Sequence, residues 1–247
     1  MNRLGFDYNR DAFLARIGTL ALKHDRARAL FFSEKLRADF VFDTAALEGN
    51  PFTFPEVKTL IEGVTVGGRN QSDAEQVSNI NDALSWVIDR VRADALVLDR
   101  ESLCRINEIV ARNASLEWGA FRTGGVTIAG TAYLPPRATD LPSIFSMGAA
   151  HILSLSEPIE RACVLFLFGS LRQFFYDGNR RSARMLASGL LLMDGLPVLQ
   201  IHATSQRMYN EVMTRFYDTQ QADEALQWLL AIYSKQLQES GFVNEAG

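Results

Sequence analysis

The sequence is poor in residues that build covalent or metal-bound frameworks. It has two cysteines and three histidines among 247 residues. Cys104 and Cys163 each fall inside an expected helix, and two such residues make neither a disulfide framework nor a metal site. The histidines share no metal-ligand spacing, so we interpret them as surface or locally bonded residues: His24, His151 and His202. These absences argue against a disulfide scaffold or a structural zinc protein and fit a reducing compartment.

Long apolar segments are also missing. The longest apolar run covers residues 162–171, well short of the ~20 residues that a membrane-spanning helix needs. The first residues lack the apolar core of a signal peptide. We therefore expect no membrane partner, a buried core helix over 162–171, and a cytoplasmic location.

Neither sign of charge is in large excess. The formal net charge is −4, and the shares of hydrophobic residues (47%) and charged residues (22%) are ordinary for a globular protein. An acidic chain gives no reason to expect nucleic-acid binding, including binding by a helix-turn-helix. No repeat or linker is visible, so we expect an N-terminal helical extension over 1–63 joined to a core over 64–247.

Apolar residues recur at helical spacing nearly throughout, which predicts a mainly α protein. The expected helices cover Arg10 to Glu48, Thr53 to near Gly63, a long stretch from Ser72, 99–113, a stretch after Pro142, about 157–174, a segment from the arginines at 180–184 to near Gly195, and two segments within 205–237. Glycine, threonine and β-branched residues dominate between Trp118 and Pro142. That composition predicts a short β-hairpin at about 124–136.

The most informative stretch covers residues 174–184, Phe-Phe-Tyr-Asp-Gly-Asn-Arg-Arg-Ser-Ala-Arg. Asp-Gly-Asn is turn chemistry between two apolar segments, so we expect a second helix that opens on three arginines. A helix N-terminus binds anions, and Arg181 and Arg184 share a face that can grip one polyphosphate. Asp177 could hold a magnesium ion that bridges phosphates. On spacing alone, a helical hairpin with solvated arginines is the alternative.

This stretch resembles the signature of the Fic (Fido) family, His-x-Phe-x-Asp/Glu-Gly-Asn-Gly/Lys-Arg-x-x-Arg. The positions in register are Phe175, Asp177, Gly178, Asn179, Arg181 and Arg184. Gln173 stands where the family has its catalytic histidine, and Arg180 stands where glycine or lysine is usual. Upstream, Thr44-Ala45-Ala46-Leu47-Glu48-Gly49 fits the family's inhibitory motif, Ser/Thr-x-x-x-Glu-Gly/Asn, and residues 121–136 resemble its flap region. Three matches in the family's order imply a Fic-type helical bundle with a short β-hairpin flap.

The resemblance implies a site for ATP and Mg²⁺. In it Asp177 would hold the magnesium ion, Gly178 and Asn179 would build the anion hole, and Arg181 and Arg184 would contact phosphates. Arg180 adds a cation where the α- or β-phosphate should lie. Lysine at this position in the Doc branch of the family accompanies phosphate transfer, so whether AMP or phosphate would move stays open. Phe175 is expected to pack in the core.

Two further elements take roles from the resemblance. The inhibitory motif (Thr44, Glu48, Gly49) would place Glu48 on Arg184 and keep the γ-phosphate from seating; the alternative is an ordinary helix-terminal glutamate in water. The flap would pair with an extended segment of an unknown target protein through Val126, Thr127, Ile128 and Ala129. The alternative there is a plain surface hairpin.

The missing histidine decides the mechanism. In the family it takes the proton from the attacking hydroxyl, and the neutral amide of Gln173 has no comparable basicity. Loss of a general base typically costs about 10²–10⁴-fold in rate. We therefore expect a weakly active, auto-inhibited protein adenylyltransferase; the alternative is a pseudoenzyme that serves as a nucleotide-binding or regulatory interaction module. The target protein and the oligomeric state, including a homo-oligomer, stay open.

Overall fold

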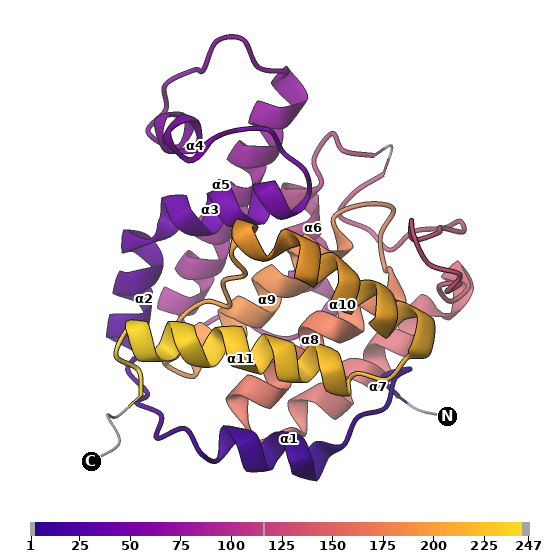
Figure 1. The fold of residues 1–247 in the computed structure, drawn as a ribbon. Coiled ribbons are helices and arrows are strands. Elements are labelled where there is room, and N and C mark those ends of the chain that lie inside the picture. Colours follow the sequence, from indigo (N-terminus) through magenta and orange to yellow (C-terminus); the bar gives the residue numbers. More distant parts are fainter. Residues whose placement is uncertain (1–2, 116, 244–247) are drawn as a thin grey trace.

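The computed structural model describes residues 3–115 and 117–243, and its regular structure is helical (Figure 1). The α-helices are α1 (Arg10–Ile17), α2 (Arg26–Lys35), α3 (Arg37–Leu47), α4 (Phe54–Ile61), α5 (Gln71–Arg92), α6 (Arg100–Val110), α7 (Leu141–Leu153), α8 (Pro158–Arg172), α9 (Asn179–Met193), α10 (Gln206–Thr219) and α11 (Asp223–Glu239). Short 3₁₀ turns precede α7 and α10: η1 (Ala138–Asp140) and η2 (Ala203–Ser205). The mainly α prediction is confirmed.

Helices α8 and α9 form a hairpin at the centre of the molecule (Figure 1). Every residue from 162 to 171 in α8 is buried, as the apolar run predicted. A helix that is apolar on all sides has to be enclosed by other elements. At Gly169 a Cβ atom would lie 2.6 Å from the Cβ of Ala183, so glycine allows the two helices to approach closely. The loop between α8 and α9 therefore stands on the most deeply buried part of the fold.

The other helices surround this pair. Helices α5 and α6 pack on each other and on α9, α10 packs on α11, and α11 contacts α8 and α1. The apolar stripe of α5 faces inward, because six of its residues are each 0% exposed: Val77, Ile80, Leu84, Val87, Ile88 and Val91. Cys104 lies in α6 and Cys163 in α8, and both are free thiols.

A buried carboxylate fixes the N-terminal segment to α8. Glu160, fully buried in the first turn of α8, accepts a hydrogen bond from the Tyr8 hydroxyl at 2.8 Å. It also accepts from Nε and Nη2 of Arg10 at 2.8 and 3.0 Å. A buried carboxylate is stable only where other groups satisfy its lone pairs. Residues 8 and 10 therefore support the start of the helix that leads to the loop.

The helical region expected from Arg10 to Glu48 consists of three helices, with a break over residues 18–25. Gly49, at φ +84°, follows the end of α3 as predicted. Helix α4 opens on a capping box, in which the Glu56 carboxylate accepts hydrogen bonds from the backbone and hydroxyl of Thr53 at 2.7 Å. In Figure 1, α4 and the loop after it project from the top of the molecule.

The β-hairpin expected at about 124–136 does not form. The described residues contain no β-strand and only two isolated bridges, both elsewhere in the chain. Instead, the Arg122 side chain donates hydrogen bonds to carbonyls at the two ends of this segment, those of Gly124 and Pro136, both at 2.6 Å. Residues 124–136, called the flap segment below, are therefore an irregular loop closed by a guanidinium group.

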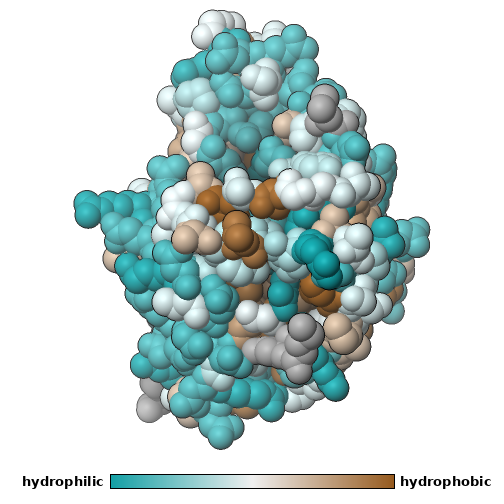
Figure 2. All heavy atoms as spheres, turned by 90° about the vertical axis from the view of Figure 1, so that its right-hand side faces the viewer, coloured by the Kyte–Doolittle hydropathy of each residue, from teal (hydrophilic) through white to brown (hydrophobic). Residues whose placement is uncertain are grey.

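Figure 2 views the molecule from the side on which the loops after α6 lie in Figure 1. This face is mostly hydrophilic, with hydrophobic residues gathered near its centre (Figure 2). Within the described ranges of the chain, no helix combines the length and the apolar character needed to cross a membrane.

Candidate functional site

The signature loop, residues 173–178, joins α8 to α9. Gln173 ends α8 in the left-handed region at φ 48°, and Gly178 at φ 75° caps the start of α9. A Cβ on Gly178 would lie 3.0 Å from Nδ2 of Asn107, and this amide donates at 2.9 Å to the Asp177 carbonyl. Backbone conformation and space both favour glycine at 178. Helix α6 thus supports the loop from behind.

Asn179 and Gln173 hold the signature loop closed. The Asn179 side chain accepts from the Phe175 backbone N–H at 2.8 Å and donates to the Phe175 carbonyl at 2.8 Å. Asn179 Nδ2 also donates to Oε1 of Gln173 at 2.9 Å, and Nε2 of Gln173 donates to the Ser170 carbonyl at 2.7 Å. Both ends of the Gln173 amide are therefore engaged with the loop and the end of α8.

A cluster of aromatic rings lies beneath the loop. The Phe174 ring centre lies 4.9 Å from that of Phe121, 5.5 Å from Phe145 and 5.4 Å from Phe168. Phe175 is 1% exposed, the core position that the sequence predicts. The cluster fixes the loop against α7, α8 and the residues just before the flap segment.

Arg181 and Asp177 form an ion pair at the N-terminus of α9. The distance from Arg181 Nη2 to Asp177 Oδ1 is 2.9 Å, and the two side chains are 4% and 43% exposed. The Nε and Nη1 atoms of Arg181 are buried and have no hydrogen-bond partner among the described residues. Unpaired buried donors are costly, so they commonly mark a place where a ligand completes the site.

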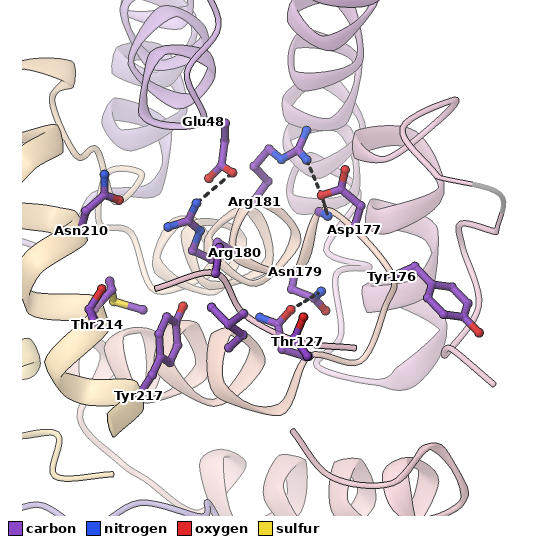
Figure 3. Close-up of a pocket in the computed structure, with 15 residues that line it drawn as sticks. Glu48, Thr127, Tyr176, Asp177, Asn179, Arg180, Arg181, Asn210, Thr214 and Tyr217 are labelled. Atoms are coloured by element: carbon purple, nitrogen blue, oxygen red, sulfur yellow. Dashed lines mark hydrogen bonds and ion pairs between the residues drawn. The ribbon is translucent and has the colours of Figure 1, made fainter. Parts of the chain in front are cut away.

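Glu48 reaches the same region, but its partner is Arg180 rather than Arg184. Glu48 Oε2 lies 3.1 Å from Arg180 Nη2 (Figure 3), so the expected pairing with Arg184 is wrong. The Arg180 guanidinium also lies 5.4 Å from the Tyr209 ring centre, and the Tyr209 hydroxyl and Glu48 raise its pKa. Arg184 is 3% exposed, its Nε has no partner among the described residues, and burial lowers its pKa.

The residues of the inhibitory motif thus have separate places. Thr44 is buried in α3 at 2% exposure and does not line the pocket. Gly49 turns the chain after the helix. Of the three, Glu48 is the one whose side chain reaches the pocket.

A pocket of about 480 Å³ lies between α3, the flap segment, the signature loop, the start of α9 and α10 (Figure 3). Its lining residues are Glu48, Thr127, Ile128, Ala129, Gln173, Tyr176, Asp177, Gly178, Asn179, Arg180, Arg181, Asn210, Met213, Thr214 and Tyr217. Most predicted site residues therefore meet in one pocket. Val126 and Arg184 are not part of its lining.

The α10 wall of the pocket was missed from the sequence. Asn210, Met213, Thr214 and Tyr217 belong to an amphipathic helix, and such a pattern predicts a buried face without showing that it meets a ligand. The hydroxyl of Tyr217 is buried and has no hydrogen-bond partner among the described residues. Tyr176 was also missed as a site residue; its hydroxyl accepts from the Gly124 N–H at 2.8 Å.

Asp177 fits a magnesium site of the nucleotide kind. Its Oδ1 accepts from Arg181 and Gly178, whereas Oδ2 accepts no hydrogen bond from the described residues. Magnesium is usually held by one or two carboxylates together with substrate phosphates and water. The described residues contain no cluster of three or more His, Cys, Asp or Glu side chains that could hold a metal. A metal at Asp177 would therefore need the nucleotide for its other ligands.

The chain resembles known proteins over most of its length. Residues 97–191 match the family model described as Fic/DOC family. "Protein adenylyltransferase Fic" of Nematostella vectensis is 24% identical over 216 residues, covering 85% of this chain and 48% of that protein. The Drosophila erecta protein of the same name is 24% identical over 217 residues, covering 82% and 40%. The chain thus spans about half or less of the length of these relatives.

Solved structures share its fold. A Fic family protein from Desulfovibrio desulfuricans matches with a TM-score of 0.73 at 19% identity, covering 98% of this chain and 74% of that one. A Fic domain-containing signalling protein from Bacteroides thetaiotaomicron gives 0.72 at 18% identity, covering 96% and 99%. "Fic-1" from C. elegans gives 0.71 at 18% identity, covering 83% and 62%. Residues 97–191 thus match the Fic/DOC family model, and the fold of the chain is shared with solved Fic proteins.

Proposed function

We propose that this protein binds ATP with Mg²⁺ in the pocket beside the signature loop and transfers AMP slowly to a hydroxyl of another protein. The observation that carries this is Arg181, which lines the pocket at the start of α9 and has two buried donors that no described residue satisfies. A helix N-terminus with such a guanidinium group suits a polyphosphate. The adenylyltransferase names of the relatives support AMP as the transferred group.

The pocket has one end for phosphates and one for a nucleoside. The signature loop and α9 supply the polar end, and the apolar part of the lining comes from Ile128 of the flap segment with the nearly buried Met213 and Tyr217 of α10. A volume of about 480 Å³ lies within the range of small-molecule sites. A Mg²⁺ ion at Asp177 would neutralise charge on the phosphates.

Transfer of AMP releases the proton of the attacking hydroxyl, which would pass to solvent water because Gln173 supplies no base. The hydroxyl oxygen bonds to the α-phosphorus, the bond from that phosphorus to the oxygen bridging to the β-phosphate breaks, and pyrophosphate leaves. An amide cannot take the hydroxyl proton, and the Gln173 amide is already bonded at both ends. Positioning and electrostatic stabilisation remain available, so slow transfer is the expected outcome.

The target protein would dock on the flap segment. No backbone N–H or C=O of residues 125–130 has a hydrogen-bond partner among the described residues. Unpaired main-chain groups of an extended segment can pair with a peptide by strand addition, whatever their side chains. Thr127, Ile128 and Ala129 also line the pocket, which would bring such a peptide next to the nucleotide.

A non-catalytic nucleotide-binding module is the second candidate. The observation that favours it is the structural use of Gln173, whose amide closes the signature loop. Incubation of the protein and candidate targets with ATP labelled on the α-phosphate separates the two. Covalent label supports transfer, whereas calorimetric binding of ATP without label supports the module. Absence of both binding and label would contradict both proposals.

Replacing Arg181 with methionine is expected to weaken ATP binding without lowering the melting temperature. A hydrogen bond to a charged group contributes about 1.5–3 kcal/mol, which corresponds to about 10–100-fold in affinity. The substitution also removes two unpaired buried donors, so the fold loses little. Calorimetry with MgATP measures the effect, with Arg112→Met, an exposed arginine outside the pocket, as control. Equal ATP affinity in both variants would place the nucleotide elsewhere.

Replacing Glu48 with glycine is expected to raise ATP affinity up to about fivefold, because a partly exposed ion pair contributes up to about 1 kcal/mol. The gain should vanish in an Arg180→Ala background if Glu48 restrains the site through Arg180. Glu62→Gly is a matched control, since Glu62 also ends a helix before a glycine and lies outside the pocket. A gain that persists without Arg180 would point back to Arg184.

A further inference from the structure

The flap segment is fastened to the signature loop at its base. The Arg122 backbone N–H donates to the Phe174 carbonyl at 2.9 Å, and its Nε donates to the Gln173 carbonyl at 2.6 Å. The same guanidinium holds the carbonyls of Gly124 and Pro136. Arg122 is 2% exposed. The base is therefore a buried fixture that joins both ends of the flap segment to the signature loop.

The far end of the flap segment is fastened to α10 by one exposed carboxylate. Oδ1 of Asp218 accepts a hydrogen bond from the Thr131 hydroxyl and another from the Ala132 backbone N–H at 3.3 Å. Asp218 follows Tyr217, which lines the pocket from α10. The contact therefore ties together two walls of the pocket, the flap segment and α10.

Between these two fastenings the chain depends on its ends. Residues 125–130 make no main-chain hydrogen bond with the described residues, and three of them, Thr127, Ile128 and Ala129, form a wall of the pocket. The Ile128 side chain packs partly buried against the core, and the rest of the stretch takes its position from its anchor points. The buried base is protected from water, whereas the hydrogen bonds at Asp218 compete with solvent. Asp218 is therefore the anchor whose loss would free the wall.

We propose that Asp218 is a positioning residue that holds the flap segment over the pocket and thereby sets how firmly a bound nucleotide is enclosed. The inference rests on the proposed nucleotide site, although Asp218 does not line the pocket. It acts through Thr131 and Ala132 on the stretch that carries Thr127 to Ala129. A position on the surface of α10, one residue beyond the pocket lining, thus controls the opposite wall.

The test compares Asp218→Ala with Asp218→Asn in the whole protein. An asparagine keeps a carbonyl oxygen that can accept from Thr131 and Ala132, so it should behave like the natural residue, whereas alanine removes the acceptor. We expect backbone ¹⁵N order parameters over residues 125–130 to fall in Asp218→Ala. Amide hydrogen exchange at Ala132, whose N–H donates to Asp218, should quicken about three- to tenfold, the effect of losing one net hydrogen bond. Dissociation of N-methylanthraniloyl-ATP should quicken by a similar factor. The melting temperature should stay close to that of the unchanged protein.

A second variant removes the donor of the same contact instead of the acceptor. Thr131→Val removes the hydroxyl donor and should lower the order parameters of residues 125–130 and quicken exchange at Ala132. Adding Asp218→Ala should then change both readouts less than it does alone. Unchanged exchange and nucleotide dissociation in Asp218→Ala would overturn the inference, as would an asparagine variant that behaves like alanine. If the unchanged protein binds no nucleotide, the proposed function fails. The exchange comparison then decides whether Asp218 anchors the flap segment.

Discussion

A protein carrying Gln173→His together with Glu48→Gly is expected to transfer AMP about 10²–10⁴-fold faster than the unchanged protein, the usual contribution of a general base. The backbone suits the exchange, since residue 173 sits at φ 48° and histidine is among the residues enriched in that region. The rest of the loop is held by Asn179, Asn107 and Arg122. Mass spectrometry of the protein after incubation with MgATP would detect added AMP.

The matched control is Gln173→Leu in the same Glu48→Gly background. It removes the amide link to Asn179, as histidine does, but supplies no base. A gain seen with both substitutions would mean that freeing Asn179, rather than adding a base, speeds the reaction. An added phosphate would show that Arg180 turns the nucleotide round. Tight ATP binding with no adduct of either kind would favour the non-catalytic module.

Phe174→Ala is expected to cause the largest loss of stability among single changes near the site, about 3–5 kcal/mol, as for other buried aromatic residues cut to alanine. Its ring is 1% exposed and packs on Phe121, Phe145 and Phe168. Its carbonyl accepts the Arg122 backbone N–H. Because the ring supports both the signature loop and the base of the flap segment, ATP affinity should fall as well. Urea unfolding followed by circular dichroism measures the stability.

Two further variants serve as controls for this prediction. Phe174→Leu keeps much of the volume and should lose far less stability than alanine. Phe31→Ala removes a ring that is 62% exposed and should change the free energy of unfolding little. Comparable losses for Phe31→Ala and Phe174→Ala would contradict the view that this cluster supports the site.

The helices could be predicted because their signals are local. The apolar run of α8, the stripe of α5 and the capping box before α4 each depend on residues a few positions apart. The flap segment was mispredicted because β-branched residues report only a preference for extended backbone. Its hydrogen bonds go to Arg122, Tyr176 and Asp218, and two of these lie far along the chain.

The ion-pair partner of Glu48 likewise could not be predicted from the sequence. Family resemblance indicated that this carboxylate pairs with Arg184 of α9, whereas it pairs with Arg180 of the same helix. Choosing between Arg180 and Arg184 requires knowing which long side chain turns towards α3, and the two lie four residues apart on one helix. The α10 wall was beyond reach because only the folded chain brings residues 210–217 opposite the signature loop.

The ion pairs of the pocket bear on how quickly a nucleotide can arrive. Two guanidinium groups and two carboxylates line it, each arginine paired with an acid, in a chain of formal net charge −4. Electrostatic steering of an anion requires a net positive field that reaches into solvent. Here each arginine is paired with a carboxylate at close range, so nucleotides reach the pocket by diffusion without long-range electrostatic attraction. Discrimination among anions then rests on short-range contacts, in which phosphate oxygens compete with Glu48 for Arg180 and with Asp177 for Arg181.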